Sequence, residues 1–416
     1  MSKSGSVITA ELKELLRSGA RAADTSLSVD KSSVAAIKES GLLAMMVPAE
    51  HGGWGWDAAA ANSVIEEVAN ADPSIAIMLY LHCGVVARID KYGRPPRRGH
   101  WLERVARDGW LACAAWAESG SAADRRVIST IARRAPSGDW TVGGEKTFVT
   151  SATVADFFLV LAQLRTENPA AQARPASAYG GSGQALFLVP RAAPGVRIPD
   201  SSLDMAGMRG SGTGTVDFDD VVVGDADLLC QRDTTVPAMQ LPHCLGLTLG
   251  AVSAGTARYA YEIALDHLRR KDKLGDPGVR SRLAQLTVAI EAARSVVADL
   301  SAQAPYQAPT LPYAAKVFAS TTSQDVCDQV RRLLGSAGYM REHEINRVCR
   351  DCEAIALMGP PNYLCLSVIG AQLDVPGGPL SVHQERPGDG VPCPAGDSLV
   401  NAGSSPGSAR RNARVR

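Results

Sequence analysis

Phe157-Phe158-Leu159-Val160-Leu161 and Leu186-Phe187-Leu188-Val189 are two short apolar runs near the middle of the chain. Runs of this length, rich in Val, Leu and Phe and bounded by turn residues, predict β-strands. Trp140-Thr141-Val142, followed by two glycines, and the alternating Val216-Asp217-Phe218 extend the same signal. We therefore expect a β domain over residues 110–236.

Helical patterns flank this β region on both sides. Residues 11–109 are Ala-rich with apolar residues at helical spacing, and residues 75–86 are almost wholly apolar, which predicts a helix buried on all sides. After residue 236 apolar residues recur every three or four positions, the pattern of an antiparallel helix bundle: Leu283, Leu286, Ile290, Ala293, Val297 and Leu300. Residues 313–334 and 344–369 predict two more helices.

The fold class that follows is α+β and multidomain. We expect an N-terminal helical domain over residues 1–109, a middle β-barrel or β-sandwich domain over residues 110–236, and a C-terminal four-helix bundle over residues 237–372. Residues 165–184 are predicted as a loop between two strands. Residues 373–416 are rich in Pro, Gly and Ser and are predicted to be a flexible tail.

Composition narrows the class of protein. The chain has 416 residues, 43 Lys and Arg against 43 Asp and Glu, and 45% hydrophobic residues. Zero net charge gives no reason to expect nucleic acid or an anionic membrane as partner. No run reaches the roughly 18 apolar residues of a membrane span. The N-terminus lacks a secretory signal pattern, and the 9 scattered cysteines are typical of reduced thiols. We expect a cytoplasmic globular protein, most simply an enzyme.

Five segments, in order, resemble motifs of the acyl-CoA dehydrogenase family. They are a Pro and Gly-Gly turn at residues 47–53, a helix break at residues 71–74, the strand motif Gly-Glu-Lys-Thr-Phe-Val-Thr-Ser at residues 144–151, the end of the β domain at residues 207–221, and Leu-Gly-Ser-Ala-Gly-Tyr with a later Arg-Asp pair at residues 334–351. The resemblance covers residues 30–372.

The resemblance implies a flavoenzyme. Members of this family bind FAD between the β domain and the helix bundle, as homodimers or homotetramers in which a subunit interface completes the adenine end. In a typical member the flavin takes a hydride from Cβ of an acyl thioester while a carboxylate removes the Cα proton. The substrate would be carried by CoA or by a carrier protein.

Cofactor contacts are carried over position by position. The resemblance places them at Trp116, Ala117, Ala122, Ala123, Phe148, Thr150, Arg270 (or Lys271), Arg332, Gly335 and Ser336. Several of these depart from the family pattern. Ala117, Ala122 and Ala123 stand where Thr, Gly and Ser are usual, and Arg332 and Ser336 replace Gln and a second Gly. FAD is the predicted cofactor, with reduced FMN as the alternative.

The usual catalytic base is missing. The resemblance places the family's glutamate at Gly359, and the alternative address on the first helix of the bundle at Leu245. Neither side chain can accept a proton. His243 and Glu353 are candidate substitutes, and Asp351 is a poorer one because its Arg-Asp pair looks structural.

Three hypotheses remain open. The first is oxidation of an acyl thioester with a non-standard base. The second is a flavin monooxygenase of the same fold, which reacts with O₂ through a hydroperoxyflavin and needs no α-proton base. The third is a catalytically weak binding protein. Pro360-Pro361 beside the missing base suggests a substrate unlike a simple fatty acyl chain, and high Ala and Arg usage resembles tailoring enzymes of specialised metabolism such as antibiotic biosynthesis.

Two other motifs have simpler explanations. Cys349-Arg350-Asp351-Cys352 is a CxxC on a predicted helix, but a zinc site needs four ligands and no second pair is at hand. We expect packed thiols and no bound metal. His82 ends an apolar helix and is predicted to be a buried, hydrogen-bonded histidine.

Overall fold

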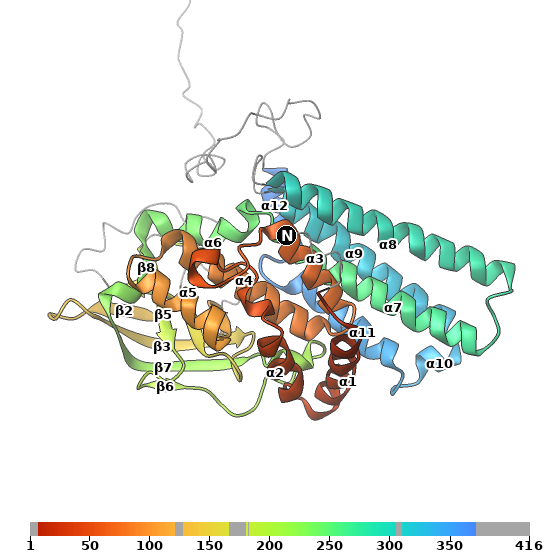
Figure 1. Ribbon diagram of the computed structural model, residues 1–416, viewed down its shortest axis with the longest axis horizontal. Coiled ribbons are helices and arrows are strands. Elements are labelled where there is room, and N and C mark those ends of the chain that lie inside the picture. Colours follow the sequence, from red (N-terminus) through yellow and green to blue (C-terminus); the bar gives the residue numbers. More distant parts are fainter. Residues whose placement is uncertain (1–6, 121–127, 166–179, 182, 305–309, 372–416) are drawn as a thin grey trace, which may run out of the picture.

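The computed structural model describes residues 7–120, 128–165, 180–181, 183–304 and 310–371. Figure 1 shows an elongated molecule with a sheet at one end, a bundle of long helices at the other, and the N-terminal helices between them. The predicted loop at residues 165–184 and the predicted tail at residues 373–416 lie mostly or wholly outside the described residues.

Five α-helices form the N-terminal part: α1 (Ala10–Ser26), α2 (Lys31–Glu39), α3 (Ala58–Ala69), α4 (Pro73–Tyr92) and α5 (Arg97–Asp108). The first four begin at residues whose side-chain oxygens accept backbone N–H groups, namely Thr9, Asp30, Asp57 and Asp72. Two 3₁₀ turns, Leu42–Ala44 and Ala49–His51, connect α2 to α3.

Helix α4 is the core helix of this part. It is long and apolar enough to span a membrane, yet 89% of its most apolar window is buried inside the fold. The residue range 344–370 passes the same length and hydropathy test with 28% of its window buried. A buried central helix is what an all-round apolar pattern predicts.

The middle domain holds eight strands: β1 (Ala112–Ala115), β2 (Ile131–Arg134), β3 (Trp140–Val149), β4 (Phe157–Leu164), β5 (Gln184–Pro190), β6 (Val196–Arg197), β7 (Gly214–Val223) and β8 (Leu228–Gln231). They follow one hydrogen-bonded path, β6-β7-β3-β2-β4-β5-β8, and β1 adds to β4. Strands β1 and β2 run parallel to β4, while the other neighbours are antiparallel.

The C-terminal part contains α6 (Thr235–Cys244), α7 (Gly250–Arg270), α8 (Pro277–Gln303), α9 (Thr310–Leu333), α10 (Ser336–Tyr339), α11 (Glu344–Leu357) and α12 (Asn362–Gly370). Helices α7, α8, α9 and α11 pack together as the bundle, and α3 packs against α7. The predicted succession of helical, β and helical domains is therefore confirmed.

One predicted helix is wrong. The sequence pattern suggested a single helix over residues 344–369, but α11 ends at Leu357 and α12 begins at Asn362. Pro360 and Pro361 lack N–H groups and disfavour helical backbone in the residue before them, so the helix stops there. The break leaves a non-helical segment, Met358–Pro361, at the position that the resemblance gives to the catalytic base.

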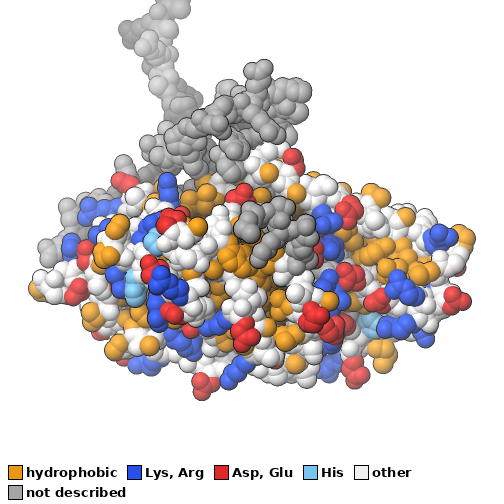
Figure 2. Space-filling model, in the orientation of Figure 1, with side chains coloured by type: hydrophobic (Ala, Val, Ile, Leu, Met, Phe, Trp, Pro, Cys, Tyr) orange, Lys and Arg blue, Asp and Glu red, His pale blue; other side chains and the backbone are white. Residues whose placement is uncertain are grey.

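Charges are interspersed on the surface. Figure 2 shows positive and negative side chains alternating over the visible face without a large area of one sign, in keeping with equal numbers of acidic and basic residues.

Candidate active site

The ends of β1 and β3 meet where the sequence places the flavin. The backbone N–H of Thr147 donates to the carbonyl of Ala117 at 2.9 Å. This bond brings Trp116 and Ala117, which follow β1, beside Phe148 and Thr150 at the end of β3. Four of the predicted cofactor residues are thus collected in one place, while Ala122 and Ala123 lie outside the described residues.

Phe148 has the features of a residue that a planar group covers. Its side chain is 56% exposed, although it is a large aromatic at the edge of a buried sheet. Its backbone lies in the left-handed region, with φ 50°, which is unusual for a bulky residue. Ser151, three positions on, carries a buried hydroxyl that has no hydrogen-bond partner in the part of the chain that the structure describes. The residues present therefore fit a flavin ring.

A buried ion pair joins the two flavin-side segments. Lys146 Nζ lies 2.7 Å from Glu118 Oε1, with the two side chains 0% and 5% exposed. Glu118 also accepts the backbone N–H groups of Ser129 and Thr130. Burial would raise the pKa of Glu118, but the charge and hydrogen bond of Lys146 and the bonds from Ser129 hold it at about 2. The carboxylate is therefore ionised and fully engaged.

Trp116 is held by a second cation. The guanidinium of Arg88, on α4, lies 4.7 Å from the centre of its ring. Arg88 is buried and donates to the carbonyls of Gly84, Ala238 and Met239. A cation so placed attracts the face of the indole and fixes its orientation.

The remaining predicted cofactor residues lie at the other end of the molecule. Arg332 ends α9, Gly335 and Ser336 begin α10, and Arg270 ends α7. Figure 1 shows α10 and the end of α7 at the tip of the bundle, far from the sheet. Gly335 has φ 59°, a conformation that favours glycine. A single chain therefore does not place these four residues beside the sheet that carries Phe148.

The two usual base positions lie in connections between helices. The sequence suggested that Leu245 lies on the first helix of the bundle. This is wrong, because Leu245 is the C-cap of α6 and α7 begins only at Gly250. Gly359 lies in the break between α11 and α12.

Neither of the two candidate carboxylates on α11, Asp351 and Glu353, is placed to replace the missing base. Asp351 accepts the N–H of Met208 at 2.6 Å and pairs with Arg347 at 3.0 Å, so both of its oxygens are engaged. Glu353 is exposed. Because it follows Asp351 by two positions, about 200° around the helix, it points away from the β domain that Asp351 contacts.

His243 and a residue missed by the sequence analysis lie at the break. The His243 ring lies 4.7 Å from that of Tyr313 on α9, and Tyr313 packs with Cys365 of α12. One turn further along α9, Lys316 is 2% exposed and donates to the carbonyls of Met358, at 3.0 Å, and Pro360. The available signal was a lysine among the small and apolar residues of α9, which alone did not indicate a site.

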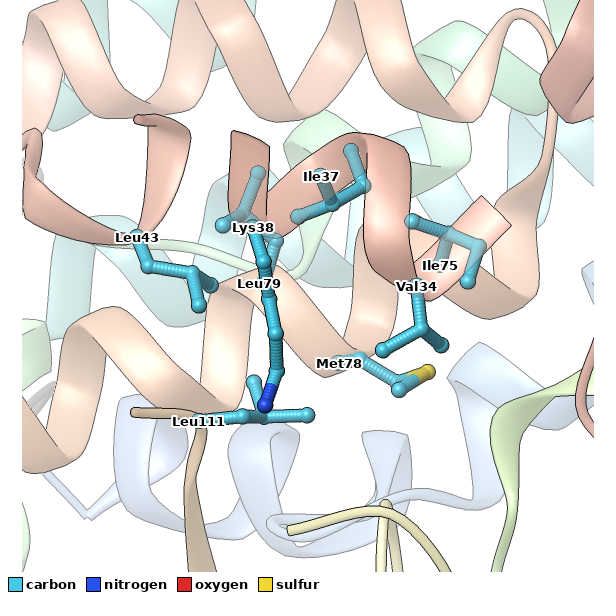
Figure 3. A pocket seen from close by; sticks show the side chains of 8 residues that line it. All are labelled: Val34, Ile37, Lys38, Leu43, Ile75, Met78, Leu79 and Leu111. Atoms are coloured by element: carbon cyan, nitrogen blue, oxygen red, sulfur yellow. The ribbon is translucent and has the colours of Figure 1, made fainter. Parts of the chain in front are cut away.

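Two cavities among the described residues lie away from this break. Figure 3 shows an apolar one of about 10 Å³ between α2, α4 and the start of β1, at most large enough for a water molecule. The other, of about 270 Å³, lies between α1, α7 and α11 and is lined mainly by charged side chains, Arg270 among them.

The CxxC thiols are packed and His82 is buried and hydrogen-bonded, as predicted, although His82 lies in the middle of α4 and not at the end of a helix. Cys349 and Cys352 are buried between α9 and α11, and the Cys349 thiol donates to the carbonyl of Cys327 at 3.6 Å. His82 is buried, contacts the carbonyl of Leu43 at 2.8 Å and accepts the N–H of Ala112 at 2.9 Å. Within the described ranges, no three His, Cys, Asp or Glu side chains are grouped to hold a metal ion.

Fold and site together define a flavoprotein of three domains, and the sequence matches one such family throughout. Family models match in order: "Acyl-CoA dehydrogenase, N-terminal domain" over residues 8–109, "middle domain" over residues 113–221 and "C-terminal domain" over residues 246–373. The chain belongs to the acyl-CoA dehydrogenase superfamily and is an oxidoreductase of that family.

Relatives of known name are distant. The cyclohex-1-ene-1-carbonyl-CoA dehydrogenase of Syntrophus aciditrophicus is 28% identical over 347 residues, 81% of this chain and 80% of that protein. FMN-bound TdsC from Paenibacillus sp. A11-2, a dibenzothiophene monooxygenase, superposes with a TM-score of 0.76 at 23% identity over 86% of this chain and 94% of TdsC. Butyryl-CoA dehydrogenase from Megasphaera elsdenii gives 0.74 at 20% identity over 87% and 98%. Both superpositions establish the fold alone.

Proposed function

We propose that this protein is a flavin-dependent monooxygenase that transfers one oxygen atom to a substrate of specialised metabolism. The observation that carries the proposal is the substrate end of the site, where Gly359 and Leu245 replace the base and where Asp351 and Glu353 do not substitute for it. Removal of an α-proton needs a base within reach of the substrate, whereas oxygen transfer does not.

Trp116, Ala117, Phe148 and Thr150 would hold the flavin ring. The bound reduced flavin supplies two electrons and two protons, so that one atom of O₂ enters the substrate and the other leaves as water. Phe148 would stack on the ring, and the backbone of Ala117 would serve where a side-chain hydroxyl is missing. The Glu118–Lys146 pair holds together the two segments that would carry these residues.

A second copy of the chain would complete the site for FAD. Arg270, Arg332, Gly335 and Ser336 lie on or beside α7, α9 and α10, and Figure 1 shows the end of α7 and α10 at the tip of the bundle, away from the sheet. A homodimer or homotetramer would bring a partner's bundle tip to the phosphates and adenine, whereas FMN would need mainly the strand side. The departures from the family pattern at residues 332 and 336 favour FMN, and FAD stays the alternative.

A second function is supported by His243. Its ring lies beside Tyr313 at the end of the bundle that also carries the Met358–Pro361 segment. The named sequence relatives include CoA dehydrogenases. Oxidation of an acyl thioester at Cα–Cβ, with His243 accepting the Cα proton, is therefore the competing proposal.

One experiment separates these functions. The purified protein is reconstituted with FMN and with FAD, and its visible absorbance is recorded under anaerobic conditions with butyryl-CoA. The flavin is then reduced chemically, and ¹⁸O₂ is admitted with indole or dibenzothiophene as probe. Oxygenation predicts no bleaching by the thioester and one ¹⁸O atom in a product.

The other outcomes are equally informative. Bleaching by butyryl-CoA would overturn the monooxygenase and make His243→Ala the next variant. Failure to bind either flavin would overturn both enzymatic proposals. A dimer or tetramer in sedimentation that dissociates as the cofactor is lost would support the shared site.

A further inference from the structure

Lys316 is tied to the break between α11 and α12. Its Nζ donates to the carbonyl of Met358 at 3.0 Å and to the carbonyl of Pro360. The thiol of Cys365, on α12, donates to the same Pro360 carbonyl at 3.4 Å. One turn further along α9, Ser320 Oγ accepts from Asn362 Nδ2 at 2.9 Å. Helix α9 thus forms hydrogen bonds with residues on both sides of the break.

Among the described residues, this buried lysine has no carboxylate partner. Of the described residues, the titratable group that acts on its charge is the Cys365 thiol. From α6, the His243 ring packs against Tyr313, one turn before Lys316 on α9. Burying an uncompensated charge is costly. The position therefore calls for an explanation beyond packing, since an apolar side chain would fill the same space without the cost of removing a charge from water.

We propose that Lys316 is a positioning residue that holds the Met358–Pro360 backbone closed against the bundle and thereby sets the shape of the substrate end of the site. Its two hydrogen bonds satisfy the carbonyls of Met358 and Pro360, which lie in the segment where the two prolines interrupt the helix. That this segment faces substrate rests on the proposed function. That Lys316 closes the segment does not, because it follows from the contacts themselves.

The closure depends on pH in a definite direction. Burial lowers the pKa of Lys316 from 10.5 to about 8, although Cys365 opposes this shift. When the segment opens and Lys316 reaches water, its pKa returns toward 10.5, so the open form holds its proton more tightly. Raising the pH from 8 to 10.5 therefore favours the closed form. Burial raises the pKa of Cys365 as well, which acts in the opposite sense at high pH but equally in any Lys316 variant.

Cys365 reports the opening directly, because it is fully buried behind the segment. The experiment measures its alkylation by iodoacetamide at pH 7, 8 and 9 in the holoprotein, normalised to a free peptide of residues 362–370. Wild type is compared with Lys316→Met and with Lys273→Met, an exposed lysine between α7 and α8. Cys113, fully buried in the sheet, monitors global unfolding.

We expect Cys365 to react faster in Lys316→Met than in wild type and in Lys273→Met. The ratio between Lys316→Met and wild type should rise about fivefold between pH 8 and pH 9, following the proton linkage. Equal rates, or a ratio independent of pH, would overturn the proposal. If Cys113 reacts as fast as Cys365 in the variant, the variant is unfolded. In that case the wild type alone tests the proposal, which predicts that its normalised Cys365 alkylation rate falls between pH 8 and pH 9. A rate that does not fall would overturn it.

Flavin affinity separates this proposal from the proposed function. FMN fluorescence quenching should give the same affinity in wild type and Lys316→Met, because the flavin residues lie on the strand side. A wild type that binds no flavin would overturn the proposed function. The Cys365 alkylation rates would still test whether Lys316 holds the segment closed.

Discussion

Two lysines, Lys146 in the sheet and Lys316 in the bundle, are buried almost equally, with 0% and 2% of their surface exposed. Lys146 faces the carboxylate of Glu118 at 2.7 Å, and that carboxylate is itself hydrogen-bonded to the backbone. Lys316 faces two carbonyls and a thiol. The first charge is neutralised where it is buried, and the second is not.

This difference separates the two halves of the site. A paired charge with every partner engaged favours one geometry over all others, which suits a surface that must receive a rigid flavin ring. The cost of burying an unpaired charge depends on its protonation state, which suits a segment that has to adapt. Under the proposed function, the strand side would therefore be the fixed half of the site and the Met358–Pro361 segment the adjustable half.

The largest expected effect comes from breaking the paired lysine. Lys146→Met leaves Glu118 buried without its cation and should destabilise the protein by about 3–5 kcal/mol. Urea unfolding at pH 7, followed by circular dichroism, measures the loss. The double variant Lys146→Met/Glu118→Met should be more stable than Lys146→Met alone, because no lone charge remains. A double variant as unstable as the sum of its two single variants would show that the pair does not act as a unit.

Lowering the pH tests the Glu118–Lys146 ion pair without substituting Lys146. The pKa of Glu118 is lowered from 4.5 to about 2 in the fold, so its contribution is complete above pH 4.5 and is lost as the pH falls toward 2. The stability advantage of wild type over Glu118→Gln should stay constant from pH 7 to pH 5 and shrink below pH 4.5. An advantage that declines already near pH 6 would mean that another group is responsible.

A smaller effect is expected from Lys316. Lys316→Met leaves two carbonyls without their donor but also removes the cost of a buried charge, so we expect a loss of about 1–2 kcal/mol at pH 7. The same urea series measures it, with Lys273→Met, expected within about 0.5 kcal/mol of wild type, as control. A loss as large as that of Lys146→Met would contradict the contrast between a paired and an unpaired lysine.

The strand side could be predicted from sequence because its signals are local patterns of neighbouring residues. The strand runs at residues 157–161 and 186–189 and the motif at residues 144–151 are local patterns, and they fall in β4, β5 and β3. His82 could be predicted as a satisfied buried histidine from its place on an apolar helix. The position of Phe148 followed from its motif, but its exposure and positive φ are properties of the assembled sheet.

The adjustable half could not be predicted because it depends on contacts distant in sequence. Apolar periodicity runs through residues 344–369 and hides the break, although Pro360 and Pro361 signalled a local distortion. Lys316 meets Met358 from 42 positions away, a contact that no periodicity reveals. The position of Leu245 outside α7 depends on where α6 ends, and helix ends are poorly defined by propensity.

The smallest effect on stability, and a direct test of the fixed half, is expected at Phe148. Because its side chain is 56% exposed, Phe148→Ala should change the unfolding free energy by no more than about 0.5 kcal/mol. If the ring stacks on the flavin, the same change should weaken FMN binding about three- to tenfold, measured by fluorescence quenching. Phe148→Tyr keeps the aromatic face and should bind as wild type does. Equal affinity in all three proteins would remove Phe148 from the flavin site, whereas weaker binding at unchanged stability would show that this exposed ring is there for the cofactor and not for the fold.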